Sequence, residues 1–239
     1  MSCDAVRARG LVKRFGAVDA LRGIDLAIDA GRTCAILGPN GAGKSTLLRL
    51  LAGLARPSGG ELAILGEKAQ GARARGRVGF VGHATWIYAE LTSRENLLFA
   101  ARLHGLADAA ERAERGLAEL GLVELAERRA GALSRGLAQR LSIARALVHD
   151  PSLVLLDEPF TGLDRPAADR LIALLGQLRS HGRTLVIVTH ASHHAAEVCD
   201  QALVLSRGRV IHEERAGEAG TVDLAPLERA VVAASESQR

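Results

Sequence analysis

A glycine-rich run over residues 38–46 carries the clearest chemical signal in the chain. Its first eight residues, GPNGAGKS, fit the pattern G-x-x-x-x-G-K-[ST], and a threonine follows them. The glycines let a loop curl so that backbone N–H groups point at a polyphosphate, and the start of the next helix adds its positive end. Lys44 would supply charge to the β- and γ-phosphates, and the Ser45 hydroxyl would ligate Mg²⁺. The pattern therefore predicts phosphate binding by Gly38, Pro39, Asn40, Gly41, Ala42, Gly43, Lys44, Ser45 and Thr46.

An apolar stretch at residues 153–156 ends in two acidic residues, Asp157 and Glu158. Taken alone, it indicates a buried strand with solvated carboxylates at its tip. Beside a phosphate-binding loop, Asp157 would instead hold Mg²⁺ and Glu158 would accept a proton from an attacking water. Phosphoryl transfer needs little covalent chemistry, so positioning and charge carry most of the rate.

A third segment, LSRGLAQR at residues 133–140, lies just before a helix that we expect over residues 142–148. Ser134 can cap a helix start and Gly136 permits close approach, so this helix end would be a second anion site. One chain needs only one γ-phosphate site. The second makes sense if it covers a nucleotide held by a partner subunit; an ordinary capped helix is the alternative.

The elements that position these motifs follow from the hydrophobic pattern. Residues 5–37 are typical of strands, and the leucines after the glycine-rich run are spaced as on a helix that ends near Gly53. A strand is expected at 77–82, and helical periodicity over 93–149 predicts a helical lobe inserted into an α/β core. Further strands at 153–156 and 184–189 flank a helix, and residues 202–212 predict a hairpin that turns at residues 206–208. The segment beyond about residue 216 could be a short helix or disordered.

Composition sets the remaining bounds. The net charge of +4 is too weak to indicate nucleic-acid binding. Three cysteines without CxxC spacing favour reduced cytosolic thiols over a metal site or disulfides. The chain has no signal-peptide pattern and no apolar stretch near the ~18 residues that span a bilayer. Any membrane component would therefore be a different chain.

Together, the three motifs resemble those of ATP-binding-cassette (ABC) ATPases, and the resemblance extends over residues 10–212. The segment 133–140 is similar to the LSGGQ signature of that family, with Arg135 and Leu137 in place of the usual Gly and Gln. The resemblance implies one domain: an α/β P-loop (RecA-like) core at 1–82 and 151–215, with an N-terminal antiparallel β subdomain. It also implies an inserted α-helical subdomain at 83–150, followed by a tail at 216–239.

Further positions match the family's pattern in the expected order. The resemblance implies that Phe15 stacks on adenine, although a core phenylalanine is the alternative. It places Asp164 in the D-loop, which crosses the dimer interface. It makes His190 the switch histidine that contacts the γ-phosphate; a strand-end position favours that role over a structural one. ATP and Mg²⁺ are the implied cofactors.

His83 departs from the family, because the same position usually carries the Q-loop glutamine. Imidazole is a poor ligand for an ion as hard as Mg²⁺, so we predict that His83 acts through water or links to a transmembrane partner. An inert replacement is the alternative. Trp86 and Tyr88 could form a socket for a partner's coupling helix or pack against the helical lobe. Histidine here, with ELT at 90–92 and RLHG at 102–105, resembles the heme-exporter ATPase of bacterial cytochrome c maturation.

The implied assembly is a homodimer, or a pair with a related ATPase subunit, that closes around two ATP molecules. It would act with integral membrane permeases at the cytoplasmic face of the inner membrane. The short stretch after the hairpin favours an exporter over an importer. The alternatives are drug or lipid exporters and a soluble ABC protein that transports nothing. A P-loop kinase or GTPase leaves Ser134 and Asp164 unexplained, and the sequence has no NKxD motif.

Overall fold

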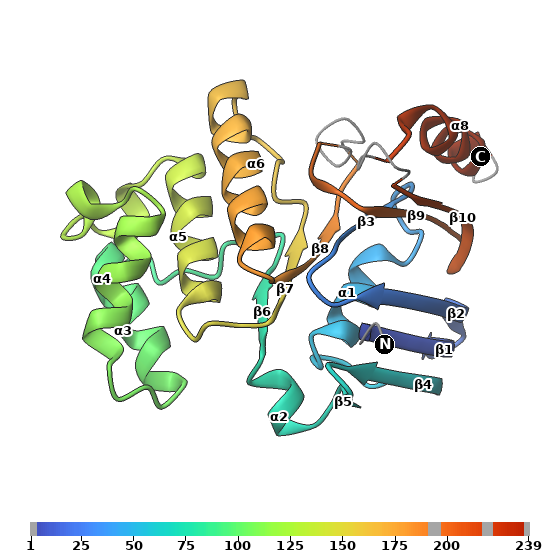
Figure 1. Ribbon diagram of the computed structural model, residues 1–239, viewed down its shortest axis with the longest axis horizontal. Helices are drawn as coiled ribbons and strands as arrows, with labels where there is room; N and C mark the ends of the chain where they lie inside the picture. The colour runs from blue at the N-terminus through green and yellow to red at the C-terminus, as the bar shows by residue number, and fades with distance from the viewer. Residues whose placement is uncertain (1–3, 191–196, 217–221, 237–239) are drawn as a thin grey trace.

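The computed structural model describes residues 4–190, 197–216 and 222–236. Two sheets and the helices that pack on them form one end of the molecule, and the three helices of the helical lobe form the other (Figure 1). The antiparallel sheet has the order β2-β1-β4-β5, with β1 and β2 paired as a long hairpin. Its strands are β1 (Asp4–Phe15), β2 (Val18–Asp29), β4 (Gly59–Ile64) and β5 (Glu67–Lys68). The strands expected within residues 5–37 are confirmed, whereas β4 and β5 carried too short a pattern to be predicted.

The second sheet is six-stranded with the order β10-β9-β3-β8-β7-β6, and all pairs except β10 with β9 are parallel. Every residue of β3, β7 and β8 is buried, as expected where helices cover both faces of a parallel sheet. The strands are β3 (Thr33–Leu37), β6 (Val78–Val81), β7 (Leu153–Asp157), β8 (Thr184–Val188), β9 (Gln201–Ser206) and β10 (Arg209–Arg215). The predicted α/β core and the 202–212 hairpin are therefore confirmed.

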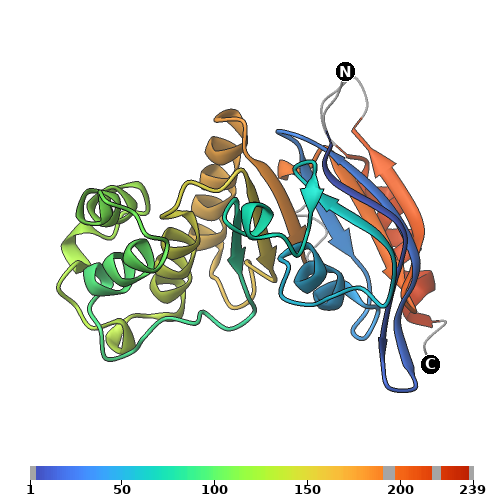
Figure 2. The same ribbon diagram turned by 90° about the horizontal axis from the view of Figure 1, so that it is seen from below.

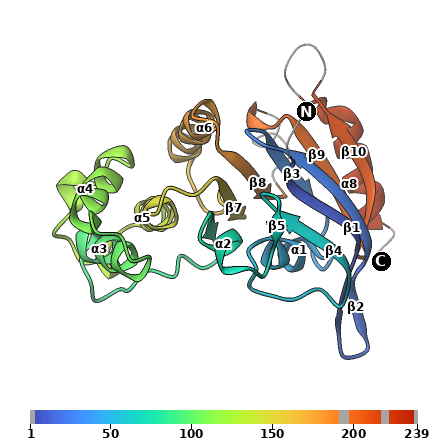
Figure 3. The same ribbon diagram turned by 60° about the horizontal axis from the view of Figure 1, so that its bottom comes forward.

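Two helices cover opposite faces of this sheet. Helix α1 (Lys44–Leu51) lies between the two sheets, where its leucines share a core with Ile36 of β3 and with the β1–β2 hairpin (Figures 2 and 3). Helix α6 (Arg165–Ser180) covers the other face, where Leu175 shares a core with Leu37. Successive residues of β3 thus pack against helices on opposite faces of the sheet. The strand ends between those two helices, where the glycine-rich loop begins.

The remaining helices of the core are short or peripheral. Helix α2 (Ala72–Arg75) precedes β6, and helix α8 (Leu224–Glu236) packs against β9 and β10. The sequence left residues beyond 216 as either a short helix or disordered. Helix α8 shows that the described part of this segment is helical. Within the described ranges, no helix has the length and hydrophobicity needed to cross a bilayer.

The helical lobe consists of α3 (Ser93–Leu103), α4 (Ala109–Glu119) and α5 (Arg135–Leu147), with 3-10 turns at Val123–Leu125 and Ala130–Ala132. A capping box starts α3, since the Thr92 hydroxyl accepts from the Glu95 N–H and the Glu95 carboxylate accepts from the Thr92 N–H. The expectation of a helix beginning at residue 142 is wrong, because α5 begins at Arg135. The Ser134 hydroxyl accepts a bond from the Leu137 N–H at 3.4 Å, and this cap starts the helix inside the signature itself.

Asp200, just before β9, ties three parts of the core together. The Thr33 N–H donates to its Oδ2 at 2.8 Å, and Arg179 and Arg32 reach its Oδ1 at 2.6 and 3.1 Å. The carboxylate is 7% exposed. A buried carboxylate that accepts several charge-assisted bonds contributes more than a surface ion pair.

Replacing Asp200 with alanine is expected to lower the free energy of unfolding by about 2–3 kcal/mol, because two arginines and one N–H lose their acceptor. Urea denaturation of the two proteins measures the difference. Glu111→Ala is the matched control, since its pair with Arg115 lies on the exposed face of α4, and it should change nothing measurable. Equal stability of both variants would contradict a stabilising role for the Asp200 contacts.

Candidate active site

The glycine-rich loop joins β3 to α1, and its backbone leaves no room for side chains at two positions. A Cβ on Gly38 (φ 139°) would overlap the Leu205 carbonyl oxygen, and a Cβ on Gly43 (φ 106°) would lie 2.7 Å from the Ala20 carbonyl oxygen. Both φ values lie in the region that favours glycine. No side chain caps the start of α1, so its first N–H groups are available to a ligand.

Lys44 is the first residue of α1 and is only 7% exposed. Its ammonium donates to the carbonyl oxygens of Gly38 at 2.6 Å and Pro39 at 3.0 Å. Burial lowers the pKa of Lys44 from its ordinary value, and the carboxylates of Glu158 and Asp157 act against that shift. The loop thus holds a partly desolvated cation, which suits a polyanionic ligand.

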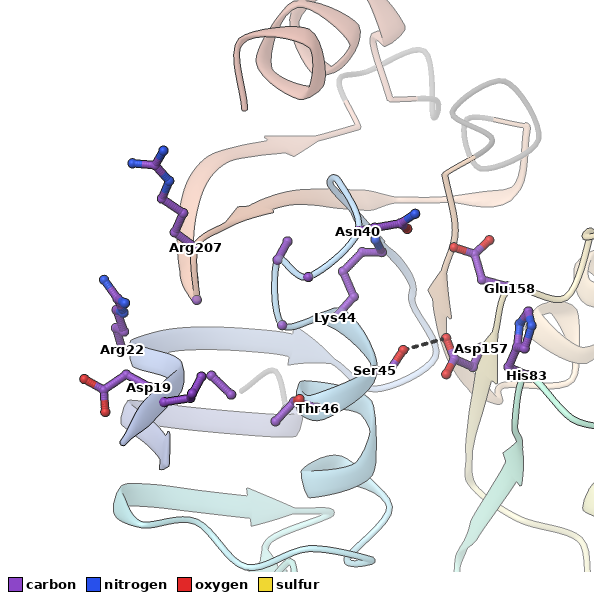
Figure 4. Close-up of a pocket in the computed structure, with 16 residues that line it drawn as sticks. Asp19, Arg22, Asn40, Lys44, Ser45, Thr46, His83, Asp157, Glu158 and Arg207 are labelled. Atoms are coloured by element: carbon purple, nitrogen blue, oxygen red, sulfur yellow. Dashed lines mark hydrogen bonds between the residues drawn. The ribbon is translucent and has the colours of Figure 1, made fainter. Parts of the chain in front are cut away.

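Ser45 and Asp157 meet across the site. The Ser45 hydroxyl donates to Asp157 Oδ1 at 3.3 Å, which is the hydrogen bond drawn in Figure 4. Burial raises the pKa of Asp157, whereas the bond from Ser45 lowers it. A hydroxyl and a carboxylate are oxygen ligands of the kind that Mg²⁺ prefers, so this pair fits the predicted metal.

Glu158 follows at the end of β7, in a left-handed conformation (φ 52°) that is uncommon outside glycine. Its N–H donates to the Val188 carbonyl at 2.8 Å, which fixes the residue at the sheet edge. Its Oε2 lies 2.9 Å from His190 Nδ1 and accepts from the His190 N–H at 3.3 Å. The carboxylate is 15% exposed and the imidazole 68% exposed, so the histidine is the more exposed member of the pair. Strain of this kind is concentrated at functional sites.

Lys44, Ser45, Asp157 and Glu158 line one pocket of about 560 Å³, whereas the predicted residues Gly38, Pro39 and His190 are not part of its lining. His83 is exposed at its edge, on the same side of the loop as Asp157 and Glu158 (Figure 4). The pocket brings together the predicted residues Asn40, Gly41, Ala42, Gly43, Lys44, Ser45, Thr46, His83, Asp157 and Glu158.

Phe15 lies outside this set. It is 53% exposed at the end of β1, with the Lys13 ammonium 4.7 Å from its ring centroid. Its strand partner Val18 does line the pocket. A buried-core role for Phe15 is thereby excluded, and stacking on adenine stays a prediction.

Ser134, Gly136 and Asp164 are also apart from the pocket. Ser134 and Asp164 are exposed and cap α5 and α6, where Asp164 accepts from the Ala167 N–H at 2.9 Å. A Cβ on Gly136 would lie 3.6 Å from Leu163, so the two helix starts are packed together. In Figure 1 they lie on the opposite side of β7 and β8 from α1.

The pattern search missed one wall of the pocket. Arg22 and Arg207 lie across the loop from Asp157 and Glu158 (Figure 4). The lining residues that the motifs did not include are Val18, Asp19, Ala20, Arg22, Arg207 and Gly208. Gly208 donates its N–H to the Ala42 carbonyl at 2.9 Å and accepts from the Arg22 N–H at 2.8 Å. The turn signal at 206–208 located the hairpin tip, but only the parallel pairing of β9 with β3 brings that tip to the loop.

Known proteins are similar to this chain in sequence and in fold. A family model described as ABC transporter matches residues 21–161. Nod factor export ATP-binding protein I of Burkholderia orbicola is 39% identical over 217 residues, 89% of this chain and 71% of the relative. Sulfate/thiosulfate import ATP-binding protein CysA of Bradyrhizobium diazoefficiens is 41% identical over 214 residues, 86% of this chain and 62% of the relative.

Solved structures agree. A dimeric ATP-binding cassette in a post-hydrolysis state, bound to ADP and phosphate, superposes with a TM-score of 0.81 at 29% identity, over 88% of this chain and 98% of the other. The cbiO1 protein of Clostridium perfringens, part of the transporter complex cbiONQ, gives 0.80 at 28% identity and covers 88% of each chain.

Proposed function

This chain belongs to the ABC transporter family, and from that premise we propose that it powers export through separate membrane-embedded subunits. It is an ATP-binding and ATP-hydrolysing subunit of an ABC transporter. The observation that supports its mechanism best is the pocket in which the glycine loop, Lys44, Asp157 and Glu158 converge.

In the proposed site, the backbone N–H groups of residues 38–46 and the Lys44 ammonium bind the β- and γ-phosphates of ATP. Ser45 and Asp157 would hold Mg²⁺, which supplies charge neutralisation to the phosphates. Phe15 would contact adenine from the edge of the β1–β2 hairpin.

Glu158 is the proposed general base that accepts a proton from the attacking water. Its fixed backbone and its contact with His190 orient the carboxylate at the edge of the pocket. His190 would keep Glu158 in position and reach the γ-phosphate. In this proposal Glu158 accepts the proton, and His190 holds the Glu158 carboxylate in position.

The second anion site, at Ser134 and Gly136, is proposed to close over the ATP of a partner subunit. Its support is its place in the fold: it is an exposed, serine-capped helix start outside the pocket of its own chain. Asp164 and the D-loop would then lie in the same interface. The partner is a second copy or a related ATPase subunit, and closure around two ATP molecules would be the power stroke.

A surface on the helical lobe is proposed to receive the membrane partner. Trp86 and Tyr88 are 68% and 49% exposed, with Phe99 packed edge-on against Tyr88 at 5.1 Å. Beside them, a groove of about 280 Å³ runs between α3 and α5. Exposed aromatics beside a groove favour a partner helix as the occupant. The permease would hold the subunit at the cytoplasmic face of the inner membrane.

The proposed transport direction and cargo rest on the names of relatives and on the sequence around His83. Export agrees with the name of the Nod factor export relative, which is 39% identical to this chain. The sulfate/thiosulfate relative, which is 41% identical, is named as an import protein. Neither relative is named for heme, so heme export stays a prediction that rests on His83 and its neighbours. Drug or lipid export is the alternative within the class, and a soluble ABC ATPase is the alternative outside it.

Co-purification from detergent-solubilised membranes tests the transporter assignment. We expect the tagged chain to bring down a multi-spanning membrane protein, and Trp86→Ala with Tyr88→Ala to weaken that association while leaving ATPase activity intact. Recovery of only soluble partners would favour the non-transport class.

Exchanging His83 for glutamine is expected to change ATP affinity less than about twofold, because the exposed imidazole is a poor Mg²⁺ ligand and is proposed to act through water or the permease. Turnover coupled to a reconstituted permease should change by about threefold or more, since His83 lies at the pocket edge towards the helical lobe. ATPase assays with and without the permease measure both. Identical behaviour of the two proteins would make His83 a neutral replacement.

A further inference from the structure

A groove of about 260 Å³ lies where α5 of the helical lobe meets α6 of the core (Figure 1). Aliphatic side chains form most of its wall, including Ile143 of α5, Leu163 of the loop before α6, and Leu174 of α6. The groove shares no lining residue with the pocket around Lys44. This α5–α6 groove is therefore separate from the nucleotide pocket of its own chain, and an occupant would contact the lobe and the core at once.

Two arginines bring positive charge into this aliphatic wall. Arg140 of α5 is half-buried and Arg170 of α6 is exposed, and both line the groove. Burial lowers the pKa of Arg140, and the positive charge of Arg170 lowers it further. The two guanidinium groups therefore repel each other, and a ligand with negative charge would relieve that repulsion.

Neither arginine is neutralised by the described part of the chain. Arg140 Nη1 donates to the Leu120 carbonyl at 3.2 Å, and the described residues give its guanidinium no other hydrogen-bond partner. Among the same residues no carboxylate forms an ion pair with Arg140 or Arg170, and this includes Glu119, an exposed acid that also lines the groove. Most of the N–H donors of Arg140 are therefore available to an acceptor in the groove.

We propose that the α5–α6 groove binds a small amphipathic carboxylate, whose aliphatic part packs on the leucines and whose carboxylate pairs with Arg140 and Arg170. Guanidinium groups bind carboxylates through paired hydrogen bonds, which are stronger where an apolar wall excludes water. The volume lies just below the range of about 300–1,000 Å³ that is usual for small-molecule sites, so a short acyl chain fits better than a partner helix. The inference goes beyond the proposed ATPase cycle and does not depend on it.

Octanoate is the probe, and a ligand-observed NMR titration of the full chain without nucleotide measures its Kd. We expect a Kd of about 1 mM or tighter. Octanamide has the same chain and no charge, so it should bind about tenfold more weakly. Acetate has the charge and no chain, so it should not bind detectably. Arg170→Gln should raise the octanoate Kd about tenfold, the effect of one lost charge-assisted contact.

Three further variants separate the outcomes. Ala173→Phe should abolish octanoate binding, because Ala173 is exposed and lines the groove, so the new ring fills it without removing a buried side chain. Arg209→Gln removes the same charge from an exposed site on β10 and should leave the Kd unchanged. Lys44→Ala should bind octanoate as the parent does, which keeps this test apart from that of the nucleotide pocket.

Equal Kd values for octanoate and octanamide would mean that the groove is only apolar, and the inference would be wrong. Equal Kd values for the parent and Arg170→Gln would also overturn it, as would unchanged binding to Ala173→Phe or no octanoate binding by the parent.

Discussion

Glu158→Gln is expected to reduce the steady-state ATPase rate about 100- to 1,000-fold while leaving ATP bound. The amide has nearly the shape of the carboxylate but cannot accept the proton of the attacking water. The left-handed backbone and the bond from Glu158 N–H to Val188 do not depend on the side-chain charge, so the fold should be unchanged. Phosphate release measures the rate, and light scattering with ATP measures the dimer that should accumulate.

Glu61→Gln is the matched control, because this exposed glutamate on β4 is outside the pocket. It should retain the full rate. Normal hydrolysis by Glu158→Gln would show that another group accepts the proton. A dead but permanently monomeric Glu158→Gln would retain the base assignment and remove the support for the sandwich.

Lys44→Ala is expected to weaken ATP binding about 100-fold or more and to abolish turnover at millimolar ATP. The ammonium is buried in the loop and bonded to the Gly38 and Pro39 carbonyls, so its loss removes both the charge and part of what holds the loop. Titration with a fluorescent ATP analogue measures the affinity. The thermal stability without nucleotide should fall little, because burying the ammonium is itself unfavourable, as its lowered pKa indicates.

Lys68→Ala provides the comparison, since this exposed lysine lies on β5 away from the pocket. Its ATP affinity should equal that of the parent. Tight ATP binding by Lys44→Ala would transfer the electrostatic role to Arg22 and Arg207, which also line the pocket.

The sequence predicted the residues that act along a single stretch of chain. The loop at 38–46 and the acids that end β7 were found because their chemistry is encoded by adjacent residues and by the strand–loop–helix order. The hairpin at 206–208 was found from its turn residues, and the buried strands from their apolar runs.

Features that depend on contacts between distant segments could not be predicted from the sequence. Strand β4 carries only short apolar alternation, and its pairing with β1 is what makes it a strand. The start of α5 was misplaced because the helix was assigned from the apolar spacing at residues 142–148, although Ser134 had been predicted to cap a helix start. Arg22 and Arg207 reach the pocket only through contacts between segments far apart in the chain.

The contacts between the β9–β10 turn and the glycine-rich loop affect how the subunit binds nucleotide. The Ala42 carbonyl accepts a bond from the Gly208 N–H, and a Cβ on Gly38 or Gly43 would meet the Leu205 or Ala20 carbonyl. Two distant segments, β2 and the β9–β10 hairpin, therefore pack against the loop before any ligand arrives. A binding loop that is already ordered does not lose conformational entropy when the ligand binds. Nucleotide capture by the single subunit should therefore be a lock-and-key event, leaving large rearrangement to the later meeting of two subunits.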